Sequence, residues 1–526
     1  IYDRLVGSEM CIRDRLSSGG IDGGSGTVLM RAANYAFGGA DRTITTTGVL
    51  TIQPDADENS FASSFDNQYL NPVSVTGLTL GKSSNASAIT LSRAISLSGP
   101  VSIYGGSIDV NANITANSGN ILLDADTGST LNQSSTGILL DDVITIETVT
   151  SGNLTLIGRS GDTGSGFDGI DASSANTTTL RSAGNLTLQG YSYAASGSGR
   201  GVDLNNDVIA ASGTVSMSGQ HNTGATYAIS LSGSTSITAG TGVTLESLND
   251  NTGTIALLSS GGIDGGSGTV LMRAANYAFG GADRTITTTG VLTIQPDADE
   301  NSFASSFDNQ YLNPVSVTGL TLGKSSNASA ITLSRAISLS GPVSIYGGSI
   351  DVNANITANS GNILLDADTG STLNQSSTGI LLDDVITIET VTSGNLTLIG
   401  RSGDTGSGFD GIDASSANTT TLRSAGNLTL QGYSYAASGS GRGVDLNNDV
   451  IAASGTVSMT GQHNTGATYA LSLSGSTSIT AGTGVTLESL NNNTGTIALL
   501  SSGGINGGSG TVLMRAANYA FGGADR

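Results

Sequence analysis

The stretch "SGPVSIYGGSIDVNANITANSGNI" runs from Ser98 to Ile121 and decides the fold. It carries a single formal charge and few large side chains, yet aliphatic residues alternate with small or polar ones along two runs, 101–104 and 107–114. Alternation with a period of two is the pattern of a half-buried β-strand. Between the runs, the Gly105-Gly106 pair supplies a tight turn. The stretch therefore predicts two short strands that share a thin aliphatic core.

The composition of the chain is that of an ordered, β-rich protein. Its 526 residues include 76 Gly and 6 Pro, and charged residues make up only 11% while hydrophobic residues make up 37%. Disordered chains usually hold more charge and fewer aliphatic residues than this. Helical spacing of apolar residues is not sustained anywhere, whereas alternation recurs throughout. We therefore expect an all-β fold built mainly from small residues.

The chain is strongly acidic, with a formal net charge of −22 at pH 7, and Lys82 and Lys324 are its only lysines. Nucleic-acid binding is not expected, because phosphate groups are neutralised by clustered Lys and Arg. No stretch approaches the run of about 20 apolar residues that spans a bilayer, so membrane insertion is not expected either. An acidic surface rich in Thr, Ser and Asn suits a protein that faces the outside of a cell.

Residues 1–15, "IYDRLVGSEMCIRDR", differ in composition from everything that follows. They hold six charged residues and the only cysteine, Cys11. The sequence GSEMCIRDR resembles a translated sequencing adapter, so we interpret residues 1–15 as a non-native segment and leave them out of the fold prediction. The alternative is a genuine mixed-charge arm. Without this segment the chain has no cysteine and no possible disulfide framework.

The rest of the chain is a tandem duplication. Residues 16–257 and 258–499 are related by an offset of 242 and differ at three positions, and residues 500–526 begin a third copy. We predict two complete repeats and a truncated start of a third, and we expect the chain to be a piece of a longer protein. The near identity indicates a recent duplication or an effect of sequence assembly. The differing pairs are Ser218/Thr460, Ile229/Leu471 and Asp250/Asn492.

A shorter, irregular period divides each copy into nine units. Each unit begins with a glycine, often preceded by Ser or Thr, and continues into a β-type run such as "NLTL". Successive starts lie 20 to 33 residues apart and together make up the 242-residue repeat. The starts in the first copy are Gly26, Gly48, Gly77, Gly99, Gly119, Gly152, Gly184, Gly213 and Gly242.

Units of this length that all begin alike predict a β-solenoid, in which each coil of the chain lies on the coil before it. Equivalent strands of successive coils then pair in parallel, about 4.8 Å apart. The core of such a coil is thin, so Val, Ile and Leu stack on their own kind and large aromatic residues find little room. The sequence thus predicts about nine coils per 242-residue repeat.

Units of unequal length should place their extra residues in loops that bulge from the coil. The longest such loops are 53–72, 158–178 and 189–207. The first concentrates acidic and aromatic residues, and we predict that it and its copy form a contact surface. The candidate contact residues are Asp55, Asp57, Glu58, Phe61, Phe65 and Tyr69.

Three segments resemble the repeat region of filamentous-haemagglutinin-like adhesins, many of which are exported by two-partner secretion. They are "GNLTLIGRSGD" (152–162), "AGNLTLQG" (183–190) and "SGPVSIYGGSIDVNANITANSGNILLDADTG" (98–128). The resemblance covers nearly all of residues 16–526 and rests on repeat style. It implies a right-handed parallel β-helix, a Gram-negative bacterial source, and a role in adhesion to cells, surfaces or biofilm matrix. It also implies export through an outer-membrane two-partner-secretion transporter.

Catalysis is not expected, and we assign no catalytic residue. His221 and His463 are the only histidines, and "GQHNTG" indicates a turn with a structural histidine. A polysaccharide lyase or hydrolase would need carboxylates close together, or carboxylates with an Arg and a cation. The best candidates for such a site are Asp162, Asp168, Asp171, Arg159 and Arg181. Their loop is rich in Gly and Ser, which favours an ordinary solvated loop.

No cofactor or metal is expected. "LLDADTGS" (122–129) and "PDADE" (54–58) place Asp at alternating positions, which an oxygen-seeking ion such as Ca²⁺ could use. Neither segment has the spacing of a known calcium loop. We therefore interpret both as ordinary turns and keep a calcium site as the alternative.

The sequence as a whole predicts the stalk of a secreted or surface-attached bacterial adhesin. Its partners would be the surface or the glycans of a host or neighbouring cell, reached by many weak contacts acting together. Two alternatives remain open. One is a carbohydrate-active β-helix enzyme, either a polysaccharide lyase or a hydrolase. The other is a purely structural surface or matrix protein.

Overall fold

The computed structural model describes residues 9–12, 20–37, 39–125, 135–225, 227–249, 251–258, 261–367, 377–500 and 502–522. Within these ranges all regular structure is β-strand, which confirms the predicted all-β class. No helix in the described ranges is long and apolar enough to cross a membrane. The chain divides into two compact units, Ile1–Thr285 and Ile286–Arg526.

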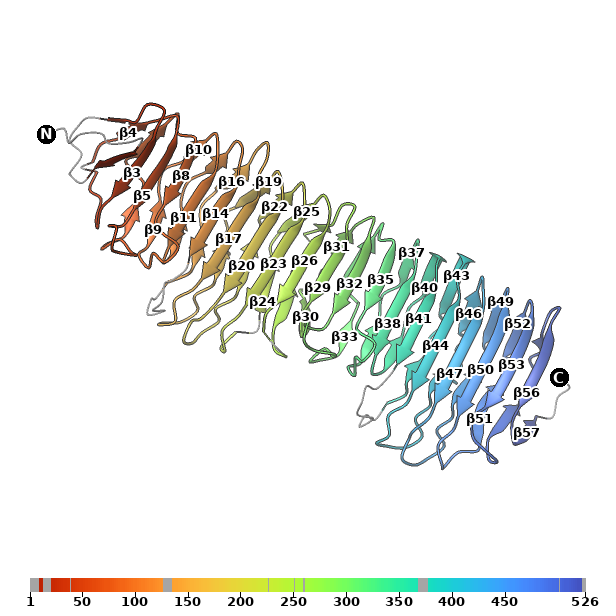
Figure 1. Ribbon diagram of the computed structural model, residues 1–526. Helices are drawn as coiled ribbons and strands as arrows, with labels where there is room; N and C mark the ends of the chain where they lie inside the picture. The colour runs from red at the N-terminus through yellow and green to blue at the C-terminus, as the bar shows by residue number, and fades with distance from the viewer. Residues whose placement is uncertain are drawn as a thin grey trace. The chain divides into compact units, whose positions relative to one another are not determined.

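In unit 1 the strands follow one another in a fixed order around three faces. Face 1 consists of β1 (Glu9–Ile12), β3 (Thr27–Arg31), β5 (Val49–Gln53), β8 (Gly77–Leu80), β11 (Val101–Gly105), β14 (Ile121–Ala125), β17 (Leu154–Arg159), β20 (Leu186–Tyr191), β23 (Val215–Gln220), β26 (Val243–Ser247) and β29 (Val270–Arg273). Figure 1 shows β17, β20 and β23 running side by side in this face.

Each face 1 strand from β5 onward is followed by a strand of face 2. Face 2 consists of β6 (Phe65–Asp66), β9 (Ile89–Leu91), β12 (Ile108–Val110), β15 (Ile138–Leu139), β18 (Ile170–Ala172), β21 (Val202–Asn205), β24 (Tyr227–Ser232), β27 (Thr254–Leu257) and β30 (Asn276–Phe279).

Face 3 closes each coil before the chain returns to face 1. It consists of β2 (Ile21–Asp22), β4 (Arg42–Thr45) and β7 (Leu70–Val73) in one sheet. A second sheet holds β10 (Ile95–Leu97), β13 (Ile114–Ala116), β16 (Thr145–Thr148), β19 (Thr179–Ser182), β22 (Val208–Ala211), β25 (Ser236–Ala239) and β28 (Ile263–Asp264).

Unit 2 repeats the same order of faces. Its face 1 holds β32 (Val291–Gln295), β35 (Gly319–Leu322), β38 (Val343–Gly347), β41 (Ile363–Ala367), β44 (Leu396–Arg401), β47 (Leu428–Tyr433), β50 (Thr456–Gln462), β53 (Gly484–Ser489) and β56 (Thr511–Arg515). Its face 2 holds β33 (Phe307–Asp308), β36 (Ile331–Leu333), β39 (Ile350–Val352), β42 (Ile380–Leu381), β45 (Ile412–Ala414), β48 (Val444–Asn447), β51 (Tyr469–Ser474), β54 (Thr496–Leu499) and β57 (Asn518–Phe521).

In face 3 of unit 2, the strands β37 (Ile337–Leu339), β40 (Ile356–Ser360), β43 (Thr387–Ser393), β46 (Thr421–Ser424), β49 (Val450–Ala453), β52 (Ser478–Ala481) and β55 (Ile505–Asn506) form one sheet. Two further short strands are β31 (Arg284–Thr287) and β34 (Leu312–Val315).

Parallel pairing in register builds the core of each unit. Along face 1, one inward row aligns Val101, Ile121, Leu154, Leu186, Val215, Val243 and Val270, and these side chains are almost fully buried. Aliphatic side chains thus stack on aliphatic side chains from coil to coil. Every interior coil covers both neighbours, so small hydrophobic residues suffice to remove apolar surface from water. The predicted parallel β-solenoid is confirmed.

Polar ladders run along the corner where face 3 returns to face 1. The backbone N–H of Asn153 donates to Oδ1 of Asn120, and the N–H of Asn185 donates to Oδ1 of Asn153, each over 2.9 Å. Thr214 continues the ladder onto Asn185, also over 2.9 Å. These bonds satisfy backbone donors that have no strand partner, since they lie just outside the sheet.

The coil count agrees with the sequence. Nine described face 1 strands, β3 to β26, precede β29, which repeats β3 one 242-residue period later. The segment Glu9–Ile12 pairs in parallel with β3 as β1, so a fold prediction that left out residues 1–15 omitted one strand. Whether that segment is native stays a prediction. The two units divide after Thr285, which differs from the repeat boundary that the sequence places after Leu257.

Candidate functional site

The segments that join face 1 to face 2, here named the 1–2 corner, carry most of the long loops. Small residues occupy the position where face 1 strands turn, because the chain approaches its own backbone closely there. Gly158, Gly190 and Gly219 are aligned in register at this position. A Cβ atom on Gly190 would lie 1.9 Å from the carbonyl oxygen of Gly201, so no other residue fits without a shift.

The predicted contact loop lies at this corner, but its aromatic residues point inward. Phe61 and Phe65 are 3% and 4% exposed, and their ring centroids lie 5.5 Å apart. Tyr35 packs edge-on against both rings at 5.7 Å, and Phe37 contacts Phe65 at 5.9 Å. The exposure assumed for these two phenylalanines is therefore wrong, because the loop folds back and uses them as its own small core.

The acidic part of the same loop is exposed. Asp57 and Glu58 point into solvent, whereas Asp55 and Tyr69 are half-buried. A role for this loop in contacting a partner stays a prediction, and it now rests on Asp57 and Glu58 rather than on the aromatic residues.

A lysine holds this loop closed. Nζ of Lys82 donates to the carbonyl oxygens of Asp55 (3.0 Å), Ala56 (3.3 Å) and Glu58. Lys324 repeats the contacts on its own loop. The carbonyl oxygens of "PDADE" that could face a cation thus receive an ammonium group, and the described carboxylates of this loop do not gather into a group of three. A calcium site here is not supported.

The second calcium candidate, 122–129, lies partly outside the described residues. Its described carboxylate, Asp124, forms an ion pair of 3.0 Å with Arg159. The guanidinium of Arg159 also lies 5.4 Å from the ring centroid of Tyr191 on the next coil. Arg159 therefore has structural partners and does not join the carboxylates considered for catalysis.

Asp168 and Asp171, two of the carboxylates considered for catalysis, lie close together. Asp203, which the sequence analysis missed, joins them. Carboxylate oxygens of Asp168, Asp171 and Asp203 all lie within 4.8 Å of one another. Asp171 and Asp203 occupy the same register position on β18 and β21. The glycines that begin these two coils, Gly152 and Gly184, lie 32 residues apart, and the same spacing separates Asp171 from Asp203. This spacing is the signal that could have revealed the alignment of the two aspartates.

Arg200 balances part of this acidic cluster. Its guanidinium forms an ion pair with Asp203, and its backbone N–H donates to Asp168 over 2.5 Å. The ring of Tyr227 lies 5.5 Å from that guanidinium. Burial raises the pKa of Asp168 from the ordinary 3.8 to about 7, and burial also raises the pKa of Asp203. Asp168 therefore holds a proton in a large fraction of molecules at neutral pH.

The other candidates lie elsewhere. Arg181 is exposed on β19 in face 3, where it aligns with Glu147 of β16. Asp162 is half-buried in the loop after β17, outside the group of three carboxylates. The structure thus brings together two of the five residues, Asp168 and Asp171, and supplies Asp203 and Arg200 as their neighbours. Unit 2 repeats this group with Asp410, Asp413 and Asp445.

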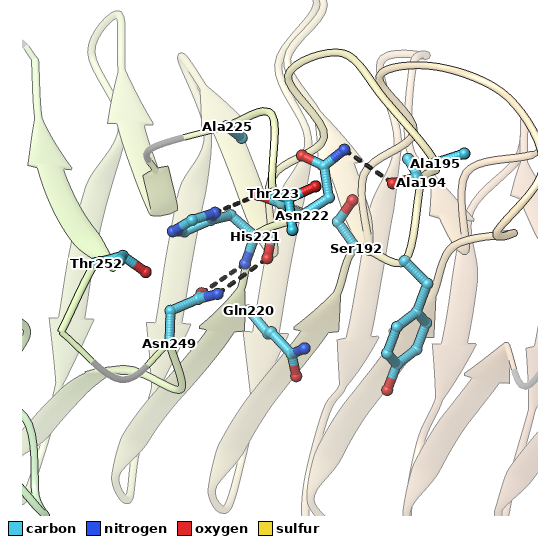
Figure 2. Close-up of a pocket in the computed structure, with 11 residues that line it drawn as sticks. Ser192, Ala194, Ala195, Gln220, His221, Asn222, Thr223, Ala225, Asn249 and Thr252 are labelled. Atoms are coloured by element: carbon cyan, nitrogen blue, oxygen red, sulfur yellow. Dashed lines mark hydrogen bonds between the residues drawn. The ribbon is translucent and has the colours of Figure 1, made fainter.

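A hollow opens beside the next three loops of the 1–2 corner (Figure 2). Its volume is about 740 Å³, and it lies among the loops that follow β20, β23 and β26. His221 follows β23 in the turn that its sequence context predicts, and it is 7% exposed. Asn249 fixes its backbone from both sides, since Oδ1 accepts from the N–H of His221 at 2.7 Å and Nδ2 donates to its carbonyl at 2.9 Å.

Asn222 forms the second buried polar group of the hollow and is 5% exposed. Its Nδ2 donates to the carbonyl oxygens of Ala194 at 3.0 Å and Ser196 at 3.1 Å, so it links two successive loops. Figure 2 shows the amide of Asn222 reaching toward Ala194 on the neighbouring loop. That the histidine is structural stays a prediction. The sequence analysis missed the hollow, because its walls come from three coils.

Comparison with known proteins gives no family assignment: the chain matches no protein-family model, no curated protein and no solved structure. The functional reading therefore rests on the fold and on the 1–2 corner.

Proposed function

We propose that the chain is the repeat region of a large secreted or surface-attached bacterial adhesin. In this role the β-solenoid is a stiff scaffold, and the loops of the 1–2 corner meet cells, surfaces or biofilm matrix. Export through an outer-membrane transporter and a Gram-negative source belong to the same proposal, which the resemblance of the repeats supports.

One observation carries the proposal. The strands of each described coil pair in parallel with those of the next coil, while the polar loops of the 1–2 corner are attached to this scaffold twice, in nearly identical copies. Duplicated binding loops on a rigid support raise the effective concentration of weak contacts, which is how multivalent attachment gains strength. An enzyme with one active centre would gain no comparable advantage from duplication of a whole 242-residue repeat.

Attachment of coated particles tests the proposal. Beads coated with the full chain should bind bacterial or animal cells, or polysaccharide matrix, above beads coated with albumin. Equal retention of both kinds of bead on every surface would contradict the adhesin proposal.

A matched variant tests the contact loop separately. Replacing Asp57, Glu58, Asp299 and Glu300 by Ser removes four exposed or half-buried carboxylates and keeps the backbone carbonyls that Lys82 and Lys324 bind. We expect weaker attachment. Unchanged attachment would assign adhesion to another part of the surface while leaving the adhesin proposal intact.

A second function is favoured by the acidic cluster alone. A carboxyl group with a pKa of about 7, close to two further carboxylates, can serve as a general acid, so hydrolysis or lysis of a polysaccharide is the alternative. Incubation with acidic and neutral polysaccharides, with and without calcium, should then shorten the polymer chains. The pair of substitutions Asp168→Asn and Asp410→Asn should abolish that cleavage.

A further inference from the structure

Face 3 carries two opposite charges that are not bonded to each other. Glu147 of β16 and Arg181 of β19 are aligned in register on neighbouring strands, where each alternates with buried residues and therefore points out of the coil. Arg181 is exposed and Glu147 is half-buried. Among the residues that the structure describes, neither side chain forms a hydrogen bond or an ion pair. Both charges are therefore available to a partner.

A hollow of about 350 Å³ lies beside this pair, at the corner where face 3 returns to face 1. Ala183, Ala210 and Ala211 line it, and their side chains are too short to fill the space. The hydroxyl group of Thr148 is already used within the chain, since it donates to the carbonyl of Gly152 at 3.0 Å and accepts from the N–H of Ala183 at 2.9 Å. The hollow therefore offers methyl groups, with the two charges at its side.

Val149 protrudes at the rim of the hollow. Between the aligned pairs Glu147/Arg181 and Leu154/Leu186, the chain advances by seven residues in one coil and by five in the next. The two extra residues make the corner that contains Val149 longer, and the side chain of Val149 is 50% exposed. We name Glu147, Arg181, Val149 and the hollow the face 3 patch.

Unit 2 has the same patch, because the two repeats are identical in this region. Glu389 and Arg423 are aligned in register, and neither forms a hydrogen bond or an ion pair within the described ranges. Val391 is 50% exposed, and the adjacent hollow has a volume of about 540 Å³. The chain therefore carries the face 3 patch twice.

The pair of charges determines what kind of partner fits. A partner with a single charge would be attracted by one member of the pair and repelled by the other. A suitable partner therefore presents a cation and an anion side by side, in the opposite order. A second copy of this chain presents both, in the same patch.

A two-fold axis in the plane of face 3, directed along the strands, exchanges the two neighbouring coils. Glu147 then faces Arg181 of the second copy, and Arg181 faces Glu147 of the second copy, as a two-fold interface requires. The same axis places the protruding Val149 opposite Ala183 of the second copy, where the hollow has room for it.

The flanking positions of the same row do not obstruct this pairing. Thr115 precedes Glu147 in the row and Ala210 follows Arg181, so the axis brings Thr115 and Ala210 of different copies face to face. Ser96 and Thr238 occupy the next positions and meet in the same way. All four side chains are short, so the charged pair can come within contact distance.

We propose that the face 3 patch is an interface between copies of this chain, in which two solenoids lie side by side in antiparallel orientation. Exposed ion pairs contribute little each, and the net charge of −22 opposes the association of free copies. The contact therefore acts between many chains held on one surface, where weak contacts add up. This interface joins neighbouring copies and goes beyond the proposed attachment to cells.

Clumping of coated beads measures the interface without any cell. Beads of two colours are coated with the full chain at equal density, and two-colour clumps are counted at physiological ionic strength. We expect clumping above that of albumin-coated beads. Absence of clumping by the unaltered chain would overturn the proposal.

Two charge-reversed variants test the geometry. One combines Glu147→Arg with Glu389→Arg, and the other combines Arg181→Glu with Arg423→Glu. Each variant alone should clump no more than albumin, because its patches meet like charges. A mixture of beads that carry the two different variants should clump again, because each patch then meets opposite charges. Clumping by either variant alone, or no recovery in the mixture, would overturn the interface, and the second result would point to a small zwitterion as the occupant.

Asp142→Arg with Asp384→Arg is the matched control. It changes the net charge as much as the first variant does, at exposed positions outside the patch, and should still clump. Loss of clumping in this control would assign the effect to net charge and overturn the proposal. Circular dichroism checks that every variant folds.

Val149→Asp with Val391→Asp provides a second test that does not depend on the charge-reversed variants. It puts a charge where the aliphatic side chain should enter the hollow, so clumping should fall. Unchanged clumping would contradict the interface. Clumping by a chain that binds no cell would reject the adhesin and keep the interface, whereas cell binding without clumping would do the reverse.

Discussion

Two parts of the 1–2 corner differ in what fills the space under their loops. In the closed corner, residues 54–64, Phe61 and Phe65 fill the space under the loop and Lys82 caps its carbonyl groups. In the open corner, residues 192–201, 221–225, 248–249 and 251–253, alanines and short polar residues leave a hollow of about 740 Å³.

The difference shows that the loops of one solenoid can either pack onto their own coil or leave an open hollow. In the closed corner the polar and aromatic residues stabilise the loop itself. Oδ1 of the buried Asn85 accepts from the N–H of Phe61 at 3.3 Å, and its Nδ2 donates to the Tyr104 carbonyl at 2.8 Å. The loops of the open corner instead surround a hollow of about 740 Å³. Aromatic side chains packed under the loop therefore distinguish the closed corner from the open one.

The largest loss of stability should come from replacing Gly190, which lies where β20 turns into its loop. Gly190→Ala together with Gly432→Ala places a Cβ 1.9 Å from a carbonyl oxygen in each copy. We expect a loss of stability of about 3 kcal/mol or more, as for other forced backbone shifts. Gly262→Ala is the control, since its nearest neighbour would lie 3.8 Å away. Urea midpoints measure both, and equal midpoints would refute the packing argument.

The next effect is a dependence on pH to which the acidic cluster and its copy contribute. Buried Asp207 and Asp449 contribute as well, since burial raises the pKa of each to about 7. Burial raises the pKa of Asp168 to about 7 and that of Asp410 to about 8. The folded chain therefore binds more protons than the unfolded chain between about pH 4 and pH 8, and the free energy of unfolding falls as pH rises through that window. Each unit of pKa shift corresponds to about 1.4 kcal/mol.

Melting temperatures at pH 5, 6, 7 and 8 measure this dependence. We expect the highest value at the acid end of the series. Asp168→Asn with Asp410→Asn keeps an oxygen for the backbone N–H of Arg200 and of Arg442 and removes two of the titrating groups. The decline should therefore become less steep and keep the part that Asp207 and Asp449 contribute. An unchanged decline in this variant would assign the pH dependence to other groups.

A smaller and local effect is expected at the closed corner. Lys82→Met removes the ammonium that binds three carbonyl groups while it keeps an unbranched apolar stem. Hydrogen bonds to a charged group contribute about 1.5–3 kcal/mol, so loop 54–64 should open more often. Hydrogen exchange would rise in that loop and stay unchanged around His221. Ser83→Ala, at an exposed neighbour, is the control.

The smallest effect is expected away from both corners. Asn153→Ala interrupts the asparagine ladder, where Oδ1 accepts from the N–H of Asn185 at 2.9 Å. A single neutral hydrogen bond contributes about 1 kcal/mol, so the urea midpoint should fall slightly. Hydrogen exchange around His221 should not change. A simultaneous rise there would mean that the asparagine ladder and the open corner are coupled.

Much of the fold could be predicted because it is local and repeated. Each coil begins with a glycine and an alternating run, and the coil length fixes which residues align, as for Asp171 and Asp203. The loops were harder to predict. The inward turn of Phe61 and Phe65 depends on Tyr35, which contacts both rings, and on Phe37, which contacts Phe65. The preceding coil supplies Tyr35 and Phe37, and no period in the sequence marks these contacts.

By itself the sequence determined the class of fold, the number of coils per repeat and the thin aliphatic core, because alternation and period act between neighbours along the chain. Only the tertiary structure decided which polar groups are satisfied. Lys82, Asn222 and His221 find or lack partners on other coils, and the balance between hydrogen bonding and burial is set where those coils meet.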